Sequence, residues 1–269
     1  MKQNLILWIL LALIAMGTGS AEASSGRKVE NTAFKRGELL VFRAMYNSRL
    51  TGNVVAGEAT LEIQHANVVV GGSPAMHIVG TVNSHGLFNL FFKVENRYDS
   101  YIDEVSMSPR RFSRRVREGR YRRNEEVIFD HTRKMAISNR GTTTIPPYVQ
   151  DIISAFYYAR TFDLTDVKPG DTFEVDFHLS DSVYVSRILY EGPELITTRL
   201  GTFKTLKFKP QVQEGTVFGQ PYPMTLWISD DDNKFPVLVE SGLVVGSVRL
   251  ELAEFRSLRN PITSFVPPQ

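Results

Sequence analysis

The densest reactive chemistry in this sequence is a run of arginines near its middle. Eight of the residues from Arg110 to Arg123 are arginine. Guanidinium groups form paired hydrogen bonds with phosphates and carboxylates, so this run is suited to an anionic ligand. The residues that we expect to bind such a ligand are Arg114, Arg115, Arg117 and Arg122. A solvated edge hairpin whose charges prevent aggregation is the alternative interpretation.

A second candidate ligand surface is apolar. Residues Leu87–Phe92 read Leu-Phe-Asn-Leu-Phe-Phe, and Phe88 and Phe91 could form the mouth of a lipid cavity. Tyr157 could line the same interior from a helix further along the chain. Ordinary core packing of these aromatic side chains is the alternative.

The signals for catalysis and for metal binding are weak. Asp151 and Asp230 are the two carboxylates considered for acid and base roles in a hydrolase. The sequence contains no cysteine, and its five histidines have no zinc-ligand spacing. Asp230-Asp231-Asp232-Asn233 lacks the alternating ligand pattern of a calcium loop and fits a hairpin turn better. We therefore expect no enzyme, no metal site and no cofactor.

Strands must position most of these residues, because two-residue periodicity dominates the chain. In Gly57–Gln64, for example, the apolar residues Ala59, Leu61 and Ile63 alternate with polar ones, which predicts a strand with one buried face. Turns recur about every 8–12 residues, the spacing of sandwiches and barrels. The strands expected after this one are 75–83, 94–102, 111–117, 121–129, 134–138, 172–179, 183–190, 194–200, 204–211, 222–229, 237–241 and 244–255, and Leu39–Tyr46 precedes it.

One segment has helical periodicity instead. Val149, Ile152, Ile153, Phe156 and Tyr157 form a single apolar stripe, which predicts a helix within about 147–160. Asp151 favours its start and Arg160 its end. The fold class that follows is mainly β, an antiparallel curled sheet or barrel-like domain with this one helix as a lid or plug. A shorter helical turn is expected near Leu87–Phe92.

The N-terminus predicts export. Lys2 precedes an uncharged apolar run from Leu5 to Met16, and Ala21-Glu22-Ala23 has the small-residue pattern of a cleavage site. Twelve apolar residues are too few to span a membrane, which takes about 20. We expect a signal peptide at 1–23, a flexible mature N-terminus at 24–33, a single β domain at 34–258 and a disordered tail at 259–269. No further long apolar run follows, so no transmembrane segment is expected after cleavage, and the expected location is the periplasm.

Four segments in order resemble the bacterial secreted family catalogued as domain of unknown function 3108. They are Phe34–Leu39, Ala56–Leu61, Val149–Arg160, and Leu226–Asp231 followed by Phe235–Val237. The resemblance spans nearly all of the chain after the signal. It implies an exported, mostly antiparallel β domain and no established catalytic residues.

These observations favour a non-enzymatic binding or carrier protein for a lipid, a lipoprotein or an anionic envelope glycan. An envelope assembly or scaffold protein that binds another protein is the second hypothesis, and a hydrolase of envelope polymers is the third. Nucleic acid is not expected as a partner, because an exported protein is separated from the nucleic acids of the cytoplasm and no aromatic stacking motif accompanies the arginines.

Overall fold

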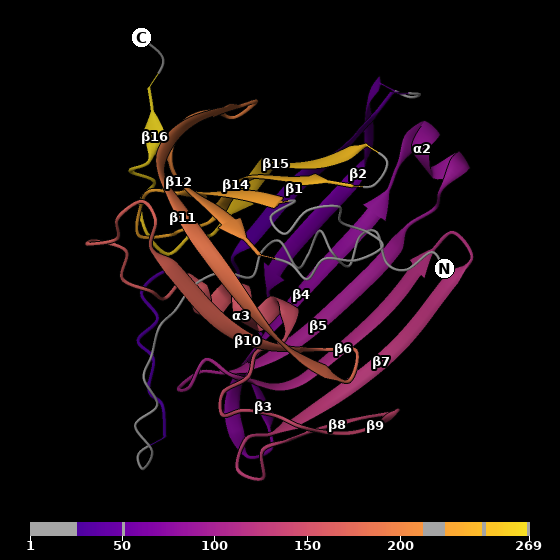
Figure 1. The fold of residues 1–269 in the computed structure, drawn as a ribbon, viewed down its shortest axis with the longest axis vertical. Helices are drawn as coiled ribbons and strands as arrows, with labels where there is room; N and C mark the ends of the chain where they lie inside the picture. Colours follow the sequence, from indigo (N-terminus) through magenta and orange to yellow (C-terminus); the bar gives the residue numbers. More distant parts are fainter. Residues whose placement is uncertain (1–25, 50–51, 212–223, 244–245, 268–269) are drawn as a thin grey trace.

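Antiparallel pairing organises almost the whole chain (Figure 1). A computed structural model describes residues 26–49, 52–211, 224–243 and 246–267. The predicted signal peptide at 1–23 lies outside the described residues. The strands are β1 (Leu39–Ser48), β2 (Gly52–Ile63), β3 (Val68–Val70), β4 (Ser73–Ser84), β5 (Glu95–Asp103), β6 (Pro109–Glu118), β7 (Tyr121–Asp130), β8 (Met135–Ser138), β9 (Gly141–Thr144), β10 (Thr172–Leu179), β11 (Ser182–Thr198), β12 (Gly201–Pro210), β13 (Met224–Ser229), β14 (Pro236–Gly242), β15 (Ser247–Arg256) and β16 (Phe265–Val266). The helices are α2 (Gly86–Phe91) and α3 (Ile152–Ala159).

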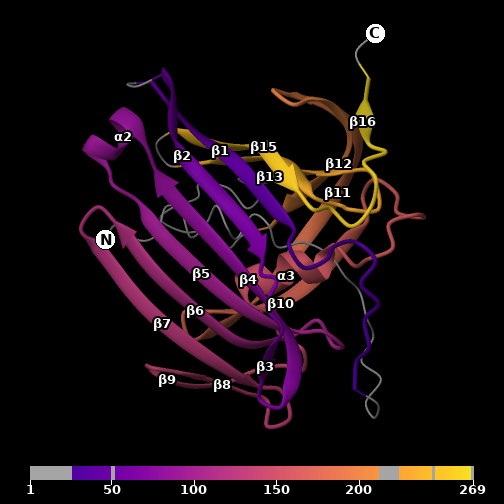
Figure 2. The same ribbon diagram turned by 180° about the vertical axis from the view of Figure 1, so that it is seen from behind.

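All of these strands belong to one curled sheet. Its order is β10-β11-β12-β13-β14-β15-β1-β2-β4-β5-β6-β7-β8-β9, with β3 added beside β4 and β16 beside β12. The sheet does not close, and in the described residues its two end strands, β9 and β10, are not paired with each other. Bulges in the pairing of β1 with both neighbours bend the sheet near its middle. The mainly β, barrel-like fold expected from the sequence is confirmed (Figure 2).

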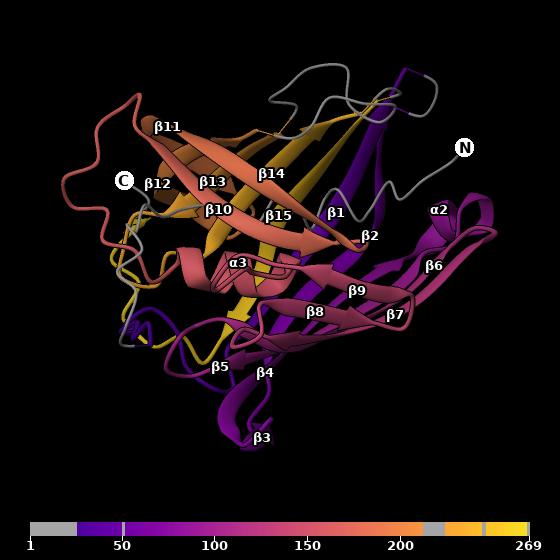
Figure 3. The ribbon, with the colours of Figure 1, turned by 60° about the horizontal axis from the view of Figure 1, so that its bottom comes forward.

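Helix α3 lies between the two arms of this curl and packs on β5 and β10 (Figure 3). Seven of its eight residues are buried, so the predicted apolar stripe extends around most of the helix. The helix also approaches β4 closely, because a Cβ added at Gly80 would lie 3.4 Å from Cδ1 of Ile153. The predicted single helix in 147–160 is therefore present as a plug inside the curl. The second helical turn, expected near 87–92, is α2.

Several local expectations were wrong. The strands expected at 183–190 and 194–200 are one long strand, β11, because a bulge at Gly192 keeps the pairing with β12 continuous. Strands β3, β9 and β16 were missed, because two to four residues are too few for a recognisable alternation.

Both ends of the expected domain are more ordered than the sequence suggested. The described part of the expected disordered tail pairs β16 with β12, and Ser264 is fully buried there. In the expected flexible N-terminus, the amide of Arg27 donates to the Tyr148 hydroxyl at 2.7 Å, and Ala33 is fully buried. These long-range contacts cannot be read from local composition, because a polar N-terminal segment and a proline-containing C-terminal segment are both typical of disordered chain.

Candidate functional site

A small apolar pocket opens on the inner face of the sheet, beneath α2. Its cavity volume is about 50 Å³. Strands β1, β2, β4 and β15 form the walls, and Phe88 of α2 and Phe92 lie across it. The lining residues are Ala44, Tyr46, Ala56, Gly57, Ala59, Val82, Asn83, Ser84, Phe88, Phe92, Val94, Val248 and Leu250.

The pocket exists because inward-facing side chains here are small. Ala44, Ala56 and Ala59 occupy positions where larger residues would fill the space. Gly57 is required for a different reason, since a Cβ at this residue would lie 2.0 Å from the carbonyl oxygen of Asn83. Only glycine therefore allows β2 and β4 to pair at this end of the sheet.

Helix α2 covers the pocket but is weakly attached. None of its six residues is buried, and its N-cap residue His85 makes no side-chain cap hydrogen bond. It is held by the Ser84 hydroxyl, which donates to the Asn89 side chain at 2.6 Å, by the His85 amide, which donates to the Ala56 carbonyl at 2.9 Å, and by ring contacts of Phe88 and Phe92. Few contacts oppose its displacement, so α2 has the properties of a lid.

The outer face of α2 is apolar as well. The exposed fractions are 77% for Leu87, 78% for Leu90 and 87% for Phe91. Phe91, which was expected to line the cavity, therefore points away from it, whereas Phe88 lines it as expected. The six-residue helix presents apolar side chains on both of its faces.

The four candidate arginines do not form one cluster. Alternation along β6 and β7 places Arg115, Arg117 and Arg122 on the exposed outer face and Arg114 on the inner face, where it is 1% exposed. Arg122 donates to the carbonyl oxygens of Gly119 and Tyr121 at 2.7 and 2.8 Å, which stiffens the hairpin tip. The three outward residues remain candidates for anion binding.

Arg114 instead forms a buried ion pair with Glu125 on the neighbouring strand. The same carboxylate accepts a hydrogen bond from Arg123 at 2.8 Å, and Arg114 also donates to the Ser180 hydroxyl at 2.9 Å. Burial lowers the pKa of Arg114, and the charge of Glu125 opposes that shift. This arrangement joins β6 and β7 to the turn after β10, so it accounts for Arg114 without an external ligand.

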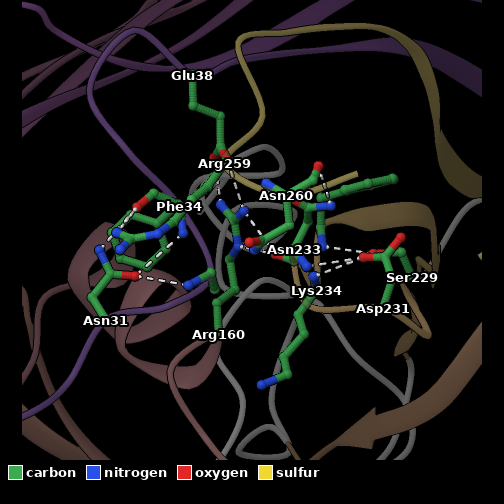
Figure 4. A network of polar contacts seen from close by, with 12 residues as sticks. Asn31, Phe34, Glu38, Arg160, Ser229, Asp231, Asn233, Lys234, Arg259 and Asn260 are labelled. Atoms are coloured by element: carbon green, nitrogen blue, oxygen red, sulfur yellow. Dashed lines mark hydrogen bonds and ion pairs between the residues drawn. The ribbon is translucent and has the colours of Figure 1, made fainter. Parts of the chain in front are cut away.

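A second buried region, which we call the polar junction, consists of Glu38, Arg160, Asp231, Asn233 and Asn260 (Figure 4). Tyr157 lies beside it, with its ring centre 5.2 Å from the Arg160 guanidinium carbon. Arg160 donates to both carboxylate oxygens of Glu38, at 2.5 and 2.8 Å, and to the carbonyl oxygen of Asn233, at 3.0 and 2.8 Å. Tyr157 packs its ring edge-on against Phe34 at 4.9 Å.

The polar junction joins four distant parts of the chain. The backbone amide of Asn260 donates to the Asn233 side chain at 2.9 Å, and the Asn260 side chain donates to the Thr32 carbonyl at 2.9 Å. Ser264 donates to the Asp231 carboxylate at 2.7 Å. Three of the four segments that carry the family resemblance meet at this junction, so their residues here have a role in folding. The remaining segment, Ala56–Leu61, forms a wall of the pocket.

Asp151 is explained by its position at the start of α3. Its carboxylate accepts hydrogen bonds from the amides of Ile153 and Ser154 and from the Ser100 hydroxyl, at 2.7, 2.8 and 2.6 Å. Burial raises the pKa of Asp151 to about 6, and these hydrogen bonds limit the shift. The residue is completely inaccessible to solvent, whereas Asp230 is exposed, so the two carboxylates considered for acid and base roles differ sharply in environment.

The acidic segment at 230–233 forms the turn between β13 and β14, as the sequence favoured. The Asp231 carboxylate accepts from the Ser229 hydroxyl and the Asn233 amide, at 2.9 and 3.0 Å. Across the described ranges, no group of three or more His, Asp or Glu side chains is arranged to hold a metal ion. Neither helix of those ranges is long and apolar enough to cross a bilayer.

Among the residues that line the pocket, the sequence singled out Phe88, whose role in ligand binding stays a prediction, and most of the lining was not predicted. The missed residues are small or aliphatic side chains such as Ala44, Ala59 and Leu250, which carry no chemical signal of their own. The usable signal was the cluster of small residues at Ala56-Gly57 with Ala59, in a strand whose neighbours bury larger side chains.

Comparisons with known proteins give one family match and one solved structure of similar fold. A family model described as "Protein of unknown function (DUF3108)" matches residues 41–253. A solved β-barrel-like protein of the DUF1849 family from Brucella abortus has 7% identity and a TM-score of 0.56, over 86% of this chain and 99% of that one. An exported-protein candidate with a YmcC-like fold from Bacteroides fragilis has 11% identity and a TM-score of 0.38, over 87% and 100% of the two chains. Among curated proteins, none matches this sequence.

Proposed function

This chain belongs to the DUF3108 family, and from that premise we propose that it is a non-enzymatic, exported binding protein for the acyl portion of an envelope lipid or lipoprotein. The observation that carries the proposal is the apolar pocket beneath α2. Export is supported by the N-terminal sequence pattern, and the periplasm is the compartment that we propose.

The side chains that line the pocket favour one class of ligand. Ligand sites are mostly apolar concavities with few polar groups, and this pocket is lined mainly by alanine, valine, leucine and phenylalanine, with Tyr46, Asn83 and Ser84 as its polar members. An acyl chain needs no hydrogen-bond partner, whereas a glycan would leave hydroxyl groups unsatisfied in such walls. An acyl chain is therefore favoured over a glycan.

The size of the pocket implies movement of the lid. The cavity of about 50 Å³ is smaller than the apolar cavity of roughly 150 Å³ that accepts benzene in a well-studied lysozyme variant. In the state described here, only the end of a chain would fit. Displacement of Phe88 and Phe92 with α2 would lengthen the cavity along the inner face of the sheet, and the few contacts of α2 permit this displacement.

Binding of a fluorescent fatty acid, with palmitate as competitor, tests the proposal. We expect saturable binding by the wild type and a loss of at least tenfold in affinity for Ala44→Leu and Ala59→Leu, because the added methylene groups occupy the cavity. The matched control is Ala253→Leu on β15, whose exposed side chain lies away from the pocket, and it should bind like the wild type.

Native mass spectrometry of protein purified from its own cell envelope supplies an independent arm. We expect a fraction of the molecules to carry an acyl-containing adduct that the Ala44→Leu variant lacks. If folded wild-type protein binds neither fatty acid nor any acyl lipid, or if both filling variants bind as well as the Ala253→Leu control, the proposal is wrong.

A further inference from the structure

The end of the sheet that carries the pocket also has an unusual outer surface. Leu87, Leu90 and Phe91 place three large, mostly exposed apolar side chains within five residues of one short helix. Exposure of such a cluster to water is unfavourable in free energy, and exposed apolar clusters of this kind are typical of interaction sites. The other exposed large hydrophobic residues of the described chain are distributed singly or in pairs over other strands and turns.

Positive charge surrounds this apolar cluster. The tip of the β6–β7 hairpin lies against the end of α2, since the Gly119 amide donates to the Lys93 carbonyl at 2.8 Å and a Cβ at Gly119 would lie 3.0 Å from the Phe92 ring (Figure 3). Four exposed cations are brought to this place: Lys93, Arg117, Arg120 and Arg122. Within residues 93–95 and 117–122, Glu95 is the solvent-accessible carboxylate, and it pairs with Lys93 at 2.7 Å and with Arg117 at 3.8 Å. Glu118 is buried, so four cations face one accessible carboxylate here and the surface keeps a net positive charge.

We propose that this combined surface, which we call the rim (Leu87, Leu90 and Phe91 with Lys93, Arg117, Arg120 and Arg122), docks on an anionic lipid bilayer. A bilayer surface offers phosphate groups at its headgroups and hydrocarbon immediately beneath, which is the pairing that the rim complements. A six-residue helix is too short to bind a membrane alone, so α2 acts as an apolar wedge and the hairpin tip supplies the electrostatic attraction.

Charge favours a bilayer over a protein partner. Guanidinium groups on a stiffened hairpin suit dense phosphate, and the attraction of each cation to an anionic leaflet adds to the next. A protein partner would have to present an apolar groove with an acidic border of matching shape. Docking in this orientation brings the mouth of the pocket to the membrane, so α2 would be displaced where acyl chains are available.

The inference goes beyond acyl binding and can fail independently of it. Flotation of the mature protein with vesicles tests it, using phosphatidylcholine alone and phosphatidylcholine with phosphatidylglycerol. We expect binding only to the anionic vesicles, decreasing as salt is raised. Arg120→Gln with Arg122→Gln should weaken binding about 25-fold, from roughly a fivefold loss per cation. The control pair Arg199→Gln with Lys204→Gln, exposed cations on the β11–β12 hairpin, should leave binding unchanged.

The apolar part of the rim has its own test. Leu90→Ser with Phe91→Ser should abolish vesicle binding while the thermal midpoint stays near that of the wild type, because both side chains are already exposed. The Phe91→Trp variant should show quenching of its tryptophan fluorescence by brominated lipids, whereas the wild type, with Trp227 buried, should not.

Equal binding to neutral and anionic vesicles, binding that survives both rim variants, or capture of a protein through the rim with no vesicle binding would overturn the proposal. Fatty-acid binding in solution should persist in the rim variants, which separates this failure from a failure of the pocket.

Discussion

Arg160 and Glu38 form a two-point ion pair in the interior of the protein, with both guanidinium Nη atoms bonded to the carboxylate, at 2.5 and 2.8 Å. They are 122 positions apart in the sequence, and both side chains are almost fully buried. The pair is completed by the carbonyl oxygen of Asn233 and by the rings of Phe34, Phe156 and Tyr157 around the guanidinium. It connects the chain entering β1 to the end of the plug helix.

Glu38→Gln should therefore destabilise the protein strongly. Removing one charge of a buried pair leaves the other uncompensated, which costs about 3–5 kcal/mol. Urea unfolding followed by circular dichroism measures the change. Asp181→Asn, which removes one partner of the exposed Arg140 pair, is the control and should cost no more than about 1 kcal/mol. Similar losses in the two variants would contradict a dominant role for the Arg160 pair.

Asp151 should make stability depend on pH between about 4 and 6. Burial raises the pKa of this carboxyl from an ordinary value of 3.8 to about 6, so the folded state takes up a proton before the unfolded state does. The stabilisation that this gives is complete below pH 4 and is lost as pH rises through 6. Asp151→Asn keeps a cap acceptor but cannot ionise.

The measurement is the difference in unfolding free energy between Asp151→Asn and the wild type across this pH range. The unfolding free energy of the variant should rise relative to that of the wild type by up to about 3 kcal/mol from pH 4 to pH 6, and the difference should then level off. A difference that stays constant with pH would show that Asp151 has an ordinary pKa. Asp130→Asn on the partly exposed end of β7 controls for general titration.

The Arg114–Glu125 pair should behave as a replaceable ion pair. Glu125→Leu leaves Arg114 without its carboxylate in the interior and should cost about 3–5 kcal/mol. Adding Arg114→Met should recover much of that loss, because a well-packed apolar pair avoids the desolvation of two charges. A double-mutant cycle from denaturant unfolding gives the coupling. If the double variant is as unstable as the sum of the two single variants, the pair is not the main interaction of either residue.

Truncation tests the order of the C-terminal segment. Deletion of residues 259–269 removes β16, the Asn260 contacts to Asn233 and the Ser264 bond to Asp231, and it should lower the unfolding free energy by about 2–4 kcal/mol. Deletion of Pro268 and Gln269 alone is the matched control and retains those contacts. Equal thermal midpoints for the two truncations would restore the expectation of a disordered tail.

The regular elements were largely predictable from local pattern. Alternation located most strands of β1 to β15, and the stripe from Val149 to Tyr157 located α3, because both periods follow from backbone geometry alone. Asp151 and Arg160 were correctly assigned to the two ends of the helix. The turn at 230–233 was also predictable, since aspartate and asparagine side chains bond to nearby amides.

The candidate site was far less predictable. Alternation shows that neighbouring arginines on β6 point to opposite faces, but it does not say which face the curl encloses. The direction in which the sheet curls determines that Arg114 is buried and that Arg115 and Arg117 are exposed. Likewise, Phe88 and Phe91 are three residues apart on α2, and the sequence does not say which of them faces the sheet. The packing of α2 on the sheet decides that Phe88 lines the pocket and Phe91 is exposed.

The sequence by itself determined the export pattern, the mainly antiparallel class and the single plug helix, because each depends on residues close together in the chain. Tertiary structure alone decided that the family segments meet in the polar junction and at the pocket wall, that the ends of the domain are ordered, and that an apolar helix lies beside a basic hairpin tip. The physical reason is that these relations depend on strand register and on the curl of the sheet. Those features arise from many weak packing contacts between distant residues, and no single segment contains them.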